Sequence, residues 1–469
     1  MLNTLNDVLN NVDNFIWGMP LIILILFTGI LLTVRLRGLQ IRHLGKALHY
    51  VFHNEDDGEG EVTSFGALCT ALSATIGTGN IVGCATAIVA GGPGALFWMW
   101  LAAFFGMATK YAEGMLAVKY RVIAEDGHTL GGPFYYIEKG MGKNFKWLAK
   151  LFCVFGTMVG LFGIGTFTQV NGITSAVNNF FDPSNVHTIS LFGMNYSISV
   201  VVAGIIVTIC AGLVIIGGIK RISKVSEVIV PFMAVTYIGV CLIIVFTHLP
   251  QVPAAFAEIV QSAFGLKAVA GGAIGAMTVA MQKGIARGIF SNEAGLGSAP
   301  IAAAAAQTNE PVRQGLVSMT GTFIDTIIVC TMTGLAIVMT GAWDMGLEGV
   351  AVTTKAFALG LPFPAKASAF VLMMCLVFFA FTTILGWNYY GERCVEYLFN
   401  RNKAVVMGYR ILYILAVFIG PYMTVKAVWN IADIFNALMA FPNLIALLAL
   451  NGVIVKETRD FHAKHNGSY

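Results

Sequence analysis

Glycine and polar residues interrupt two long apolar stretches of this chain. The sequence IGTGN at 76–80 lies inside an apolar run over 64–90, and GGAIGA at 271–276 lies inside another over 268–289. Each glycine costs a helix roughly 1 kcal/mol relative to alanine, so both stretches are expected to break. A break inside a membrane exposes N–H groups that attract a carboxylate and carbonyl oxygens that attract a small cation. Close packing of helices against small residues is the alternative that the sequence leaves open.

Other polar side chains also lie inside apolar runs, where an uncompensated polar group is costly. Gln169 carries an amide, Thr382 and Thr383 carry hydroxyls, and Trp387 follows Thr383 by four residues on one helical face. For the amide, the alternative role is a hydrogen bond between helices; for the threonines, it is a bond to the preceding turn. Asp325 is an intramembrane carboxylate, which by default suggests function, although hydrogen bonds from neighbouring threonines would explain it equally well.

The composition decides what kind of protein carries these residues. Of the 469 residues, 57% are hydrophobic and 11% are charged, and the mean hydropathy is +0.77. Such a chain cannot build the charged surface of a soluble enzyme, and it is not a disordered chain. A net charge of +4 argues against a nucleic-acid partner. The eight cysteines are scattered and form no disulfide framework or metal motif. We therefore expect an all-α polytopic protein in a lipid bilayer.

A bilayer core needs about 20 apolar helical residues per span. Eleven stretches qualify: 14–34, 64–90, 93–118, 147–180, 198–219, 225–247, 268–289, 314–341, 366–398, 407–424 and 428–455. Alternating their directions leaves only Lys267, Lys355, Lys366 and Lys426 of the 28 basic residues on the outer side. This is the positive-inside pattern. It predicts an external N-terminus and a cytoplasmic C-terminus in a cell inner (plasma) membrane.

The spans fall into two halves that follow one extra N-terminal helix at 14–34. Five spans cover 64–247 and five cover 268–455, and an odd number makes the two halves insert in opposite orientations. Each half opens on an interrupted span, and interruptions at matching positions in inverted halves indicate a secondary-transporter site. We treat residues 1–469 as a single transmembrane domain.

Four long stretches carry a more specific resemblance. They are GTGNIVGCATAIVAGGPGALFWMWLAAFFGMATKYAEGMLAVKYR at 77–121, GGPFYYIEKGMG at 131–142, FSNEAGLGSAP at 290–300 and GWNYYGER at 386–393. They resemble the alanine or glycine:cation symporter family, and the resemblance covers essentially the whole chain. It implies a LeuT-type 5+5 inverted repeat preceded by one helix, eleven transmembrane helices in all. It also implies sodium-coupled import of small neutral amino acids, without an organic cofactor.

The resemblance implies two sets of site residues. In it, the backbone N–H groups at the first break hold the substrate carboxylate, and the second break, an amide, a hydroxyl and an indole complete the pocket. These substrate residues are Thr78, Gly79, Asn80, Gln169, Ala273, Ile274, Gly275, Thr383 and Trp387. The sodium ligands are the carbonyls of Ser73, Ile76 and Phe379 and the hydroxyls of Thr382 and Thr383. An indole beside a glycine-rich break would limit the substrate to alanine or glycine.

Three rival functions remain. A proton-coupled transporter of the same fold would place a titratable group near the cation site, whereas these ligands are neutral oxygens and the span at 225–247 has no lysine; sodium is therefore favoured. A membrane enzyme would need a catalytic motif such as HExxH or GxSxG, and neither occurs. A channel would repeat a filter around a symmetry axis, whereas this chain has two unlike breaks. We expect a transporter, not an enzyme, that functions as a monomer.

Overall fold

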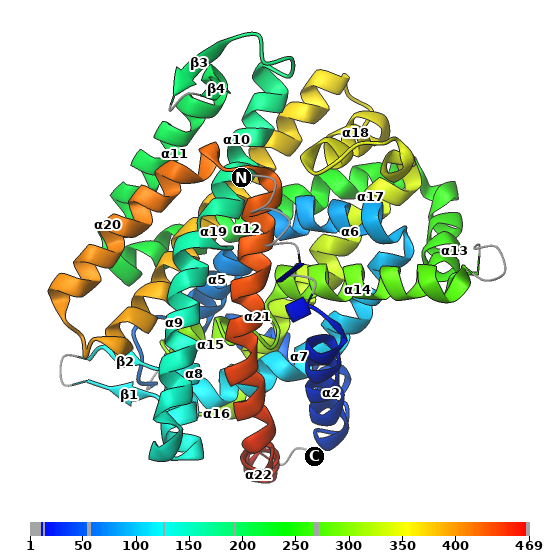
Figure 1. The fold of residues 1–469 in the computed structure, drawn as a ribbon. Helices are drawn as coiled ribbons and strands as arrows, with labels where there is room; N and C mark the ends of the chain where they lie inside the picture. The colour runs from blue at the N-terminus through cyan, green and yellow to red at the C-terminus, as the bar shows by residue number, and fades with distance from the viewer. Residues whose placement is uncertain are drawn as a thin grey trace.

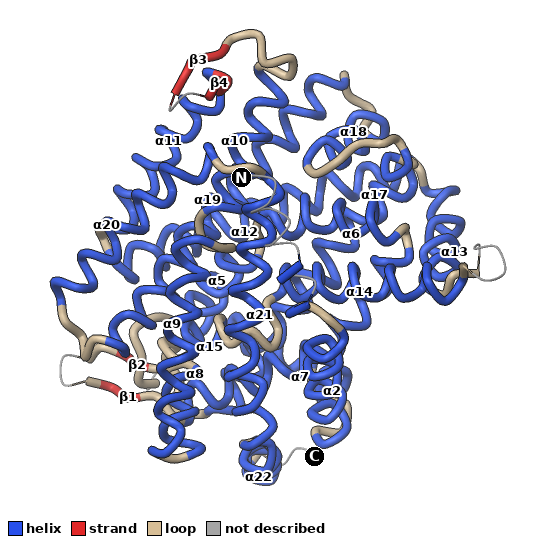
Figure 2. Tube along the Cα trace, in the orientation of Figure 1, coloured by secondary structure: helices blue, strands red, loops and turns tan. Residues whose placement is uncertain are grey.

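The computed structural model describes residues 11–12, 15–53, 58–124, 127–191, 194–266 and 272–465. The chain is mostly helical (Figures 1 and 2). The helices up to residue 263 are α2 (Met19–Arg35), α3 (Leu39–Arg42), α4 (Leu44–Phe52), α5 (Ser64–Thr75), α6 (Cys84–Gly91), α7 (Gly94–Lys119), α8 (Pro133–Tyr135), α9 (Lys146–Phe162), α10 (Phe167–Phe181), α11 (Ile198–Ile215), α12 (Gly218–Thr247) and α13 (Val252–Ala263).

The helices after residue 272 are α14 (Ala273–Asn292), α15 (Ala299–Ala303), α16 (Pro311–Thr322), α17 (Thr331–Thr340), α18 (Val350–Gly360), α19 (Ala365–Leu398), α20 (Lys403–Ile419), α21 (Val425–Ala449) and α22 (Asn451–Lys464). The π-helical turns are η1 (Gly79–Gly83), η2 (Tyr136–Met141) and η5 (Phe323–Cys330). The 3₁₀ turns are η3 (Lys143–Phe145), η4 (Leu249–Gln251), η6 (Ala342–Asp344) and η7 (Gly420–Tyr422).

Two antiparallel hairpins lie at opposite ends of the helical body, and the sequence did not predict them. Strands β1 (Val122–Ile123) and β2 (Thr129–Leu130) pair at one end, and β3 (Thr188–Leu191) and β4 (Met194–Ser197) pair at the other. Figure 1 shows β3 and β4 at the top and α22 near the bottom. Side-chain contacts join the loops near the lower hairpin: Arg121 bonds to Glu59 and Thr308, and Lys119 bonds to Glu457. We call this end the β1–β2 face; it is formed by 58–62, 119–124, 127–130, 304–310 and α22.

Several helices are long and apolar enough to cross a membrane. Seven of those in the described chain qualify by length and composition, and the bent pair at 64–75 and 79–91 makes an eighth. The outer surfaces of these helices carry large apolar side chains, as a surface that faces lipid does. Ile209 of α11 and Val235 of α12, for example, are 58% and 71% exposed. A helical membrane protein with several spans is thereby confirmed. The count of eleven spans and the 5+5 repeat remain predictions.

The structure corrects two predicted helices. The stretch at 147–180 lies within one helical span long and apolar enough to cross a membrane, but the helix is interrupted, because α9 ends at Phe162 and α10 begins at Phe167. Residues 273–276 do not form an interior break, because α14 begins at Ala273 and runs without interruption to Asn292. Gly271 and Lys267 lie outside the described residues, as do position 14 of the first predicted span and 268–270 of the seventh. The interruption of this span follows α14 instead, at 293–298.

Candidate functional site

The predicted break at 76–80 is present, and two side-chain amides hold its backbone. The helical pieces on its two sides meet at 52°. Asn80 Oδ1 accepts a hydrogen bond from the Gly77 N–H at 2.9 Å, and Gln169 Oε1 accepts one from the Thr78 N–H at 3.0 Å. All four residues are buried. The structure therefore brings Gln169 of α10 onto the break that carries Thr78, Gly79 and Asn80.

Gln169 is itself placed by the unpredicted break between α9 and α10. Its Nε2 donates to Ile164 O at 2.9 Å, and Ile164 lies within that break. Trp387 of α19 packs against the same break, because a Cβ built on Gly165 would lie 2.7 Å from Trp387 Cβ. A third interruption therefore fixes both the amide and the indole near the first break. Gly163 and Gly165 were the signal in the sequence that could have shown it.

The threonine pair of α19 faces the carbonyl end of the first break. Thr383 Oγ1 lies 3.2 Å from Ile76 O and 3.1 Å from Phe379 O, and Thr382 Oγ1 lies 2.9 Å from Phe379 O. Ser73 precedes Ile76 by three residues at the end of α5. All of these oxygens belong to neutral groups, and hard cations are bound by oxygen ligands. Both threonine hydroxyls do bond to the preceding turn, as the alternative role required, but Thr383 also reaches across to α5.

A buried carboxylate faces the other side of the break. Asp325 belongs to the π-helical turn η5. Its Oδ1 accepts from Asn80 Nδ2 at 2.8 Å, and its Oδ2 accepts from Ser291 Oγ at 2.7 Å and Thr326 Oγ1 at 2.8 Å. The threonine bond was one of the two roles left open for Asp325. The contact with Asn80 connects this carboxylate to the predicted substrate residues.

The second break, at 293–298, is held by carboxylates to which the sequence gave no role in the site. Glu293 has a left-handed backbone with φ of +57°, which is unusual for a residue with a Cβ. Its Oε1 accepts from Trp387 Nε1 at 2.8 Å. Glu113 of α7 accepts from the Gly295 N–H at 3.1 Å and from Asn443 Nδ2 at 2.6 Å. Trp387 therefore joins the second break to the one between α9 and α10.

The structure does not bring Ala273, Ile274 and Gly275 to this site. They form the first turn of α14, where Ile274 is 76% exposed and a Cβ on Gly275 would meet nothing within 4 Å. Gly272 and Gly275 therefore lie at the start of a helix rather than in an interruption. The sequence does contain a signal for the second break, which the prediction did not use: Gly295 and Gly297, which both have positive φ there.

A layer of aromatic and charged side chains covers the first break on the α14 side. The Phe290 ring lies 3.2 Å from a Cβ built on Gly79 and 4.9 Å, centroid to centroid, from the Trp429 ring. Arg287 lies over Trp429 at 4.7 Å and forms two bonds to Asp433, at 3.0 and 2.7 Å. The first break is therefore closed on this side by a ring and an ion pair.

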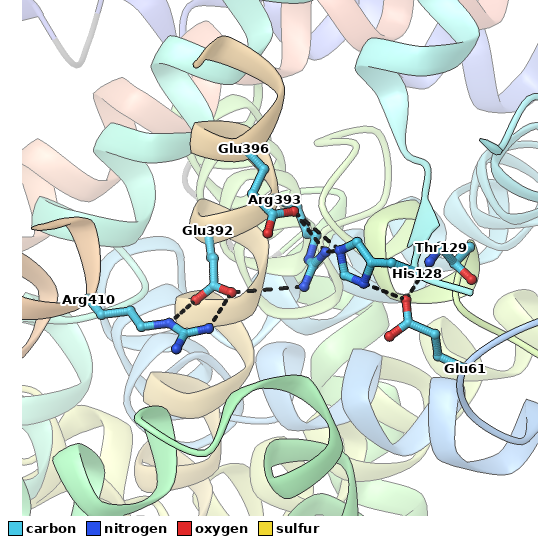
Figure 3. A network of polar contacts seen from close by, with 7 residues as sticks. All are labelled: Glu61, His128, Thr129, Glu392, Arg393, Glu396 and Arg410. Atoms are coloured by element: carbon cyan, nitrogen blue, oxygen red, sulfur yellow. Dashed lines mark hydrogen bonds and ion pairs between the residues drawn. The ribbon is translucent and has the colours of Figure 1, made fainter. Parts of the chain in front are cut away.

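On the β1–β2 face, an ion-pair network connects the hairpin to α19 and α20 (Figure 3). His128 lies 3.2 Å from a Glu61 carboxylate oxygen and 3.5 Å from one of Glu396. Arg393 bonds to Glu396 at 2.7 Å. A second pair extends the network, since Glu392 bonds to Arg410 at 2.6 Å. The Glu61 carboxylate also accepts from the Thr129 N–H at 2.6 Å.

The network fixes the charge of His128. Hydrogen bonds to Glu396 and Glu61 raise the pKa of His128 to about 9, although burial and Arg393 oppose them. Burial raises the pKa of Glu61, but hydrogen bonds from His128 and the Thr129 N–H outweigh it and leave that pKa below its usual value. His128 is therefore a cation between two carboxylates at neutral pH.

This charge predicts how stability depends on pH. A histidine whose pKa is higher in the folded state stabilises that state, and this contribution is fully present below the ordinary histidine pKa of about 6.5. That stability is lost as the pH rises through about 9. In detergent, we expect the melting temperature of the parent to fall between pH 7 and 9.5 more steeply than that of His128→Gln. The exposed His187 supplies the control variant His187→Gln, which should follow the parent. Parallel pH profiles for the parent and His128→Gln would contradict the assigned charge.

Comparisons with known proteins identify the family of the chain. Residues 2–468 match the family described as the Sodium:alanine symporter family. The chain is 46% identical over 464 residues to the sodium/alanine symporter AgcS of Methanococcus maripaludis, covering 97% of both chains. It is 38% identical to the probable sodium/glutamine symporter GlnT of Bacillus subtilis, covering 98% of this chain and 91% of that one.

The fold also resembles a solved structure. The crystal structure of MhsT in complex with L-phenylalanine superposes with a TM-score of 0.55 at 13% identity, over 84% of this chain and 99% of that one. At this identity the likeness concerns the fold alone, and it agrees with the helical transporter architecture. The family match spans nearly the whole sequence and the relatives are similar over their whole lengths. The chain belongs to the sodium:alanine symporter family of membrane transporters.

Proposed function

We propose that the protein is a sodium-coupled symporter that imports small neutral amino acids, alanine and glycine, by alternating access. One observation carries the proposal: a buried break with partly free backbone lies between the Gln169 amide and the Thr383 hydroxyl. Substrate and cation would then bind within a few ångströms of each other, so that each can contribute directly to the binding of the other. The names of the relatives, sodium/alanine and sodium/glutamine symporter, support sodium as the coupling ion.

The substrate carboxylate binds at the N–H groups of Thr78 and Gly79. The Thr78 N–H now donates to Gln169 Oε1, so a bound carboxylate takes that position, and the amide turns its Nε2 toward the substrate. Trp387 bounds the pocket beside the α-carbon, because its ring is fully buried between two breaks. A side chain larger than that of alanine would have to displace the indole.

Sodium binds between α5 and α19. Its ligands are the carbonyls of Ser73, Ile76 and Phe379 with the hydroxyls of Thr382 and Thr383. Asp325 balances the charge of the coupling ion from the far side of Asn80, to which it is hydrogen-bonded. The layer of Phe290, Trp429, Arg287 and Asp433 closes the site from outside. The β1–β2 face lies in the cytoplasm, in accordance with the distribution of basic residues.

The function is tested in proteoliposomes loaded without sodium. We expect saturable uptake of alanine and glycine that requires an inward sodium gradient. Glutamine, leucine and methionine are added as competitors to test the size limit that Trp387 sets. A proton gradient without sodium forms the second arm, because the buried carboxylates Asp325, Glu113 and Glu293 favour proton coupling as the second candidate. Uptake that follows the proton gradient alone would make the proton, instead of sodium, the coupling ion. No uptake under either gradient would refute the proposed function.

The sodium site has its own prediction. Thr383→Val keeps the shape of the side chain and removes the hydroxyl. Loss of such a contact costs about 1–2 kcal/mol, or roughly tenfold in the sodium concentration for half-maximal uptake. Thr208→Val on α11 is the matched control, since its hydroxyl bonds only to the preceding turn at Gly204 O. A Thr383→Val protein with parental sodium activation, measured by sodium-dependent alanine binding, would contradict the ligand assignment.

A further inference from the structure

The chain at the end of α2 carries basic side chains and exposed apolar side chains in turn. α2 is an apolar helix, and the short helices α3 and α4 follow it directly. The basic residues of this stretch are Arg35, Arg37, Arg42 and Lys46. The large apolar side chains exposed between them are those of Val34, Ile41, Leu48 and Phe52. This combination next to a membrane helix is typical of a segment that lies on a lipid surface.

The last helix of the chain, α22, lies against this stretch. Arg35, at the end of α2, donates a hydrogen bond to Asn451, at the start of α22, and Figure 1 shows both helices at the same end of the molecule. His43, between α3 and α4, stacks on His462 of α22 with the ring centroids 4.4 Å apart. The two ends of the chain therefore meet here. We call the group that they form the basic cluster; it consists of Arg42, His43, Lys46 and His462.

The basic cluster concentrates positive charge. Burial lowers the pKa of His462 to about 4, and the cationic residues around it add to the effect. Those residues are His43, Lys46, Arg42 and His465. The pKa of His43 is lowered in the same way, first by burial and then by Arg42 and Lys46. Both imidazoles are therefore neutral at neutral pH, where Arg42 and Lys46 carry the charge and the rings offer hydrogen-bonding nitrogens.

The carboxylates of α22 do not balance this charge. Glu457 pairs with Lys119 at 2.7 Å, and Asp460 lies 3.7 Å from the arginine that precedes it. Among the residues that the structure describes, no carboxylate forms an ion pair with Arg42 or Lys46. The contacts of the Lys46 ammonium are aromatic, with two rings at 5.2 and 5.6 Å. An anion from outside the described chain would therefore meet two charges that are available to bind it.

We propose that the basic cluster binds the headgroup of an anionic phospholipid, whose acyl chains lie against the exposed apolar side chains of the same stretch. The Arg42 guanidinium and the Lys46 ammonium suit the phosphate oxygens of such a headgroup. A free phosphate would meet the same charges but would leave Ile41 and Phe52, which are 69% and 73% exposed, in water. The bound lipid connects the first helix to the last one. This proposal depends on the place of the chain in a membrane, and on neither the substrate nor the coupling ion.

A fluorescent label beside the cluster tests this proposal. Gly45 is exposed and a Cβ built on it would meet nothing within 4 Å, so Gly45→Cys accepts a bimane label. Cys210→Ser removes the exposed native cysteine, and the others are buried. The full-length protein in mixed micelles is titrated with phosphatidylglycerol or phosphatidylcholine, both with brominated acyl chains that quench bimane on contact. We expect half-maximal quenching at a mole fraction at least about tenfold lower for phosphatidylglycerol.

Two double variants separate the cluster from the net charge of the protein. Arg42→Gln with Lys46→Gln should reduce the preference for phosphatidylglycerol to within about twofold. The matched control is Arg221→Gln with Lys224→Gln at the start of α12, where both side chains are exposed, and it should keep the preference of the parent. Equal loss in both variants would show that only net charge matters and would overturn the proposal, as would a parent without any preference.

Two further measurements distinguish a lipid from a free anion and report on folding. Inorganic phosphate in excess should not reverse the quenching by brominated phosphatidylglycerol, whereas unbrominated phosphatidylglycerol should. Reversal by inorganic phosphate would assign the cluster to a soluble anion and overturn the lipid proposal. Phosphatidylglycerol should also raise the melting temperature of the parent and of the α12 control, because a ligand of the folded state stabilises it, but not that of the cluster variant. An equal rise in all three proteins would contradict binding at the cluster.

Discussion

Gly77→Ala should weaken sodium and alanine binding about tenfold to a hundredfold and reduce transport accordingly. A Cβ at this position would lie 2.5 Å from Thr383 Oγ1 and 2.9 Å from Gln169 Oε1. One methyl group would therefore displace both the proposed sodium ligand and the amide that holds the Thr78 N–H. Overpacking of this kind costs roughly 1–3 kcal/mol, or about tenfold to a hundredfold in binding. Equilibrium binding of sodium and alanine to the purified variant is the measurement, alongside uptake in proteoliposomes.

Gly275→Ala is the matched control for this prediction. It makes the same change in the other glycine-rich stretch, where a Cβ would meet nothing within 4 Å. We expect parental binding and a small gain in stability, because alanine is the better helix former. Equal losses of binding in both variants would indicate that the first turn of α14 belongs to the site after all. Full activity in Gly77→Ala would show that ligands do not use the space between Gln169 and Thr383.

Asp325→Asn is expected to weaken the binding of sodium. The substitution keeps the shape of the side chain and removes the charged carboxylate, whose oxygens accept hydrogen bonds from Asn80, Ser291 and Thr326. Hydrogen bonds to a charged group contribute about 1.5–3 kcal/mol, so the sodium concentration for half-maximal alanine uptake should rise roughly tenfold or more. Sodium titrations of uptake and of alanine binding provide the measurement.

The control for Asp325 is Asp344→Asn, in η6, whose side chain is exposed. It makes the same chemical change away from the site and should leave sodium activation as in the parent. If Asp325→Asn also retained the parental sodium dependence, the carboxylate would be a structural hydrogen-bond acceptor for Asn80. A shift in the pH dependence of uptake with no shift in sodium would instead favour the proton-coupled candidate.

Composition and hydropathy determined the class of the protein without any structure. A chain with 11% charged residues and long apolar runs has no stable arrangement outside a bilayer. The break at 76–80 was also predictable, because Gly77 and Gly79 weaken the helix locally. Four long motifs identified the family, which the comparison with family descriptions confirms. Each of these features depends on neighbours in sequence or on summed composition, so no tertiary contact was needed.

Glycine alone could not tell which second stretch is interrupted. The pair Gly272 and Gly275 and the pair Gly295 and Gly297 look alike as sequence, yet of these four glycines only Gly295 and Gly297 adopt positive φ. The difference comes from partners elsewhere in the chain: Glu113 binds the Gly295 N–H, and Trp387 binds Glu293. A break persists where distant side chains satisfy its backbone.

The partners of the polar residues were likewise decided by the tertiary structure. The sequence placed Gln169, Thr383 and Asp325 inside the membrane and required each to find a hydrogen bond, because an unpaired polar group is costly there. It did not say with which atom. Gln169 meets Thr78 across 91 positions of the chain, and Asp325 meets Asn80 across 245. Periodicity and spacing describe one helix at a time, whereas a site between three helices depends on how they pack, and only the folded chain decides that.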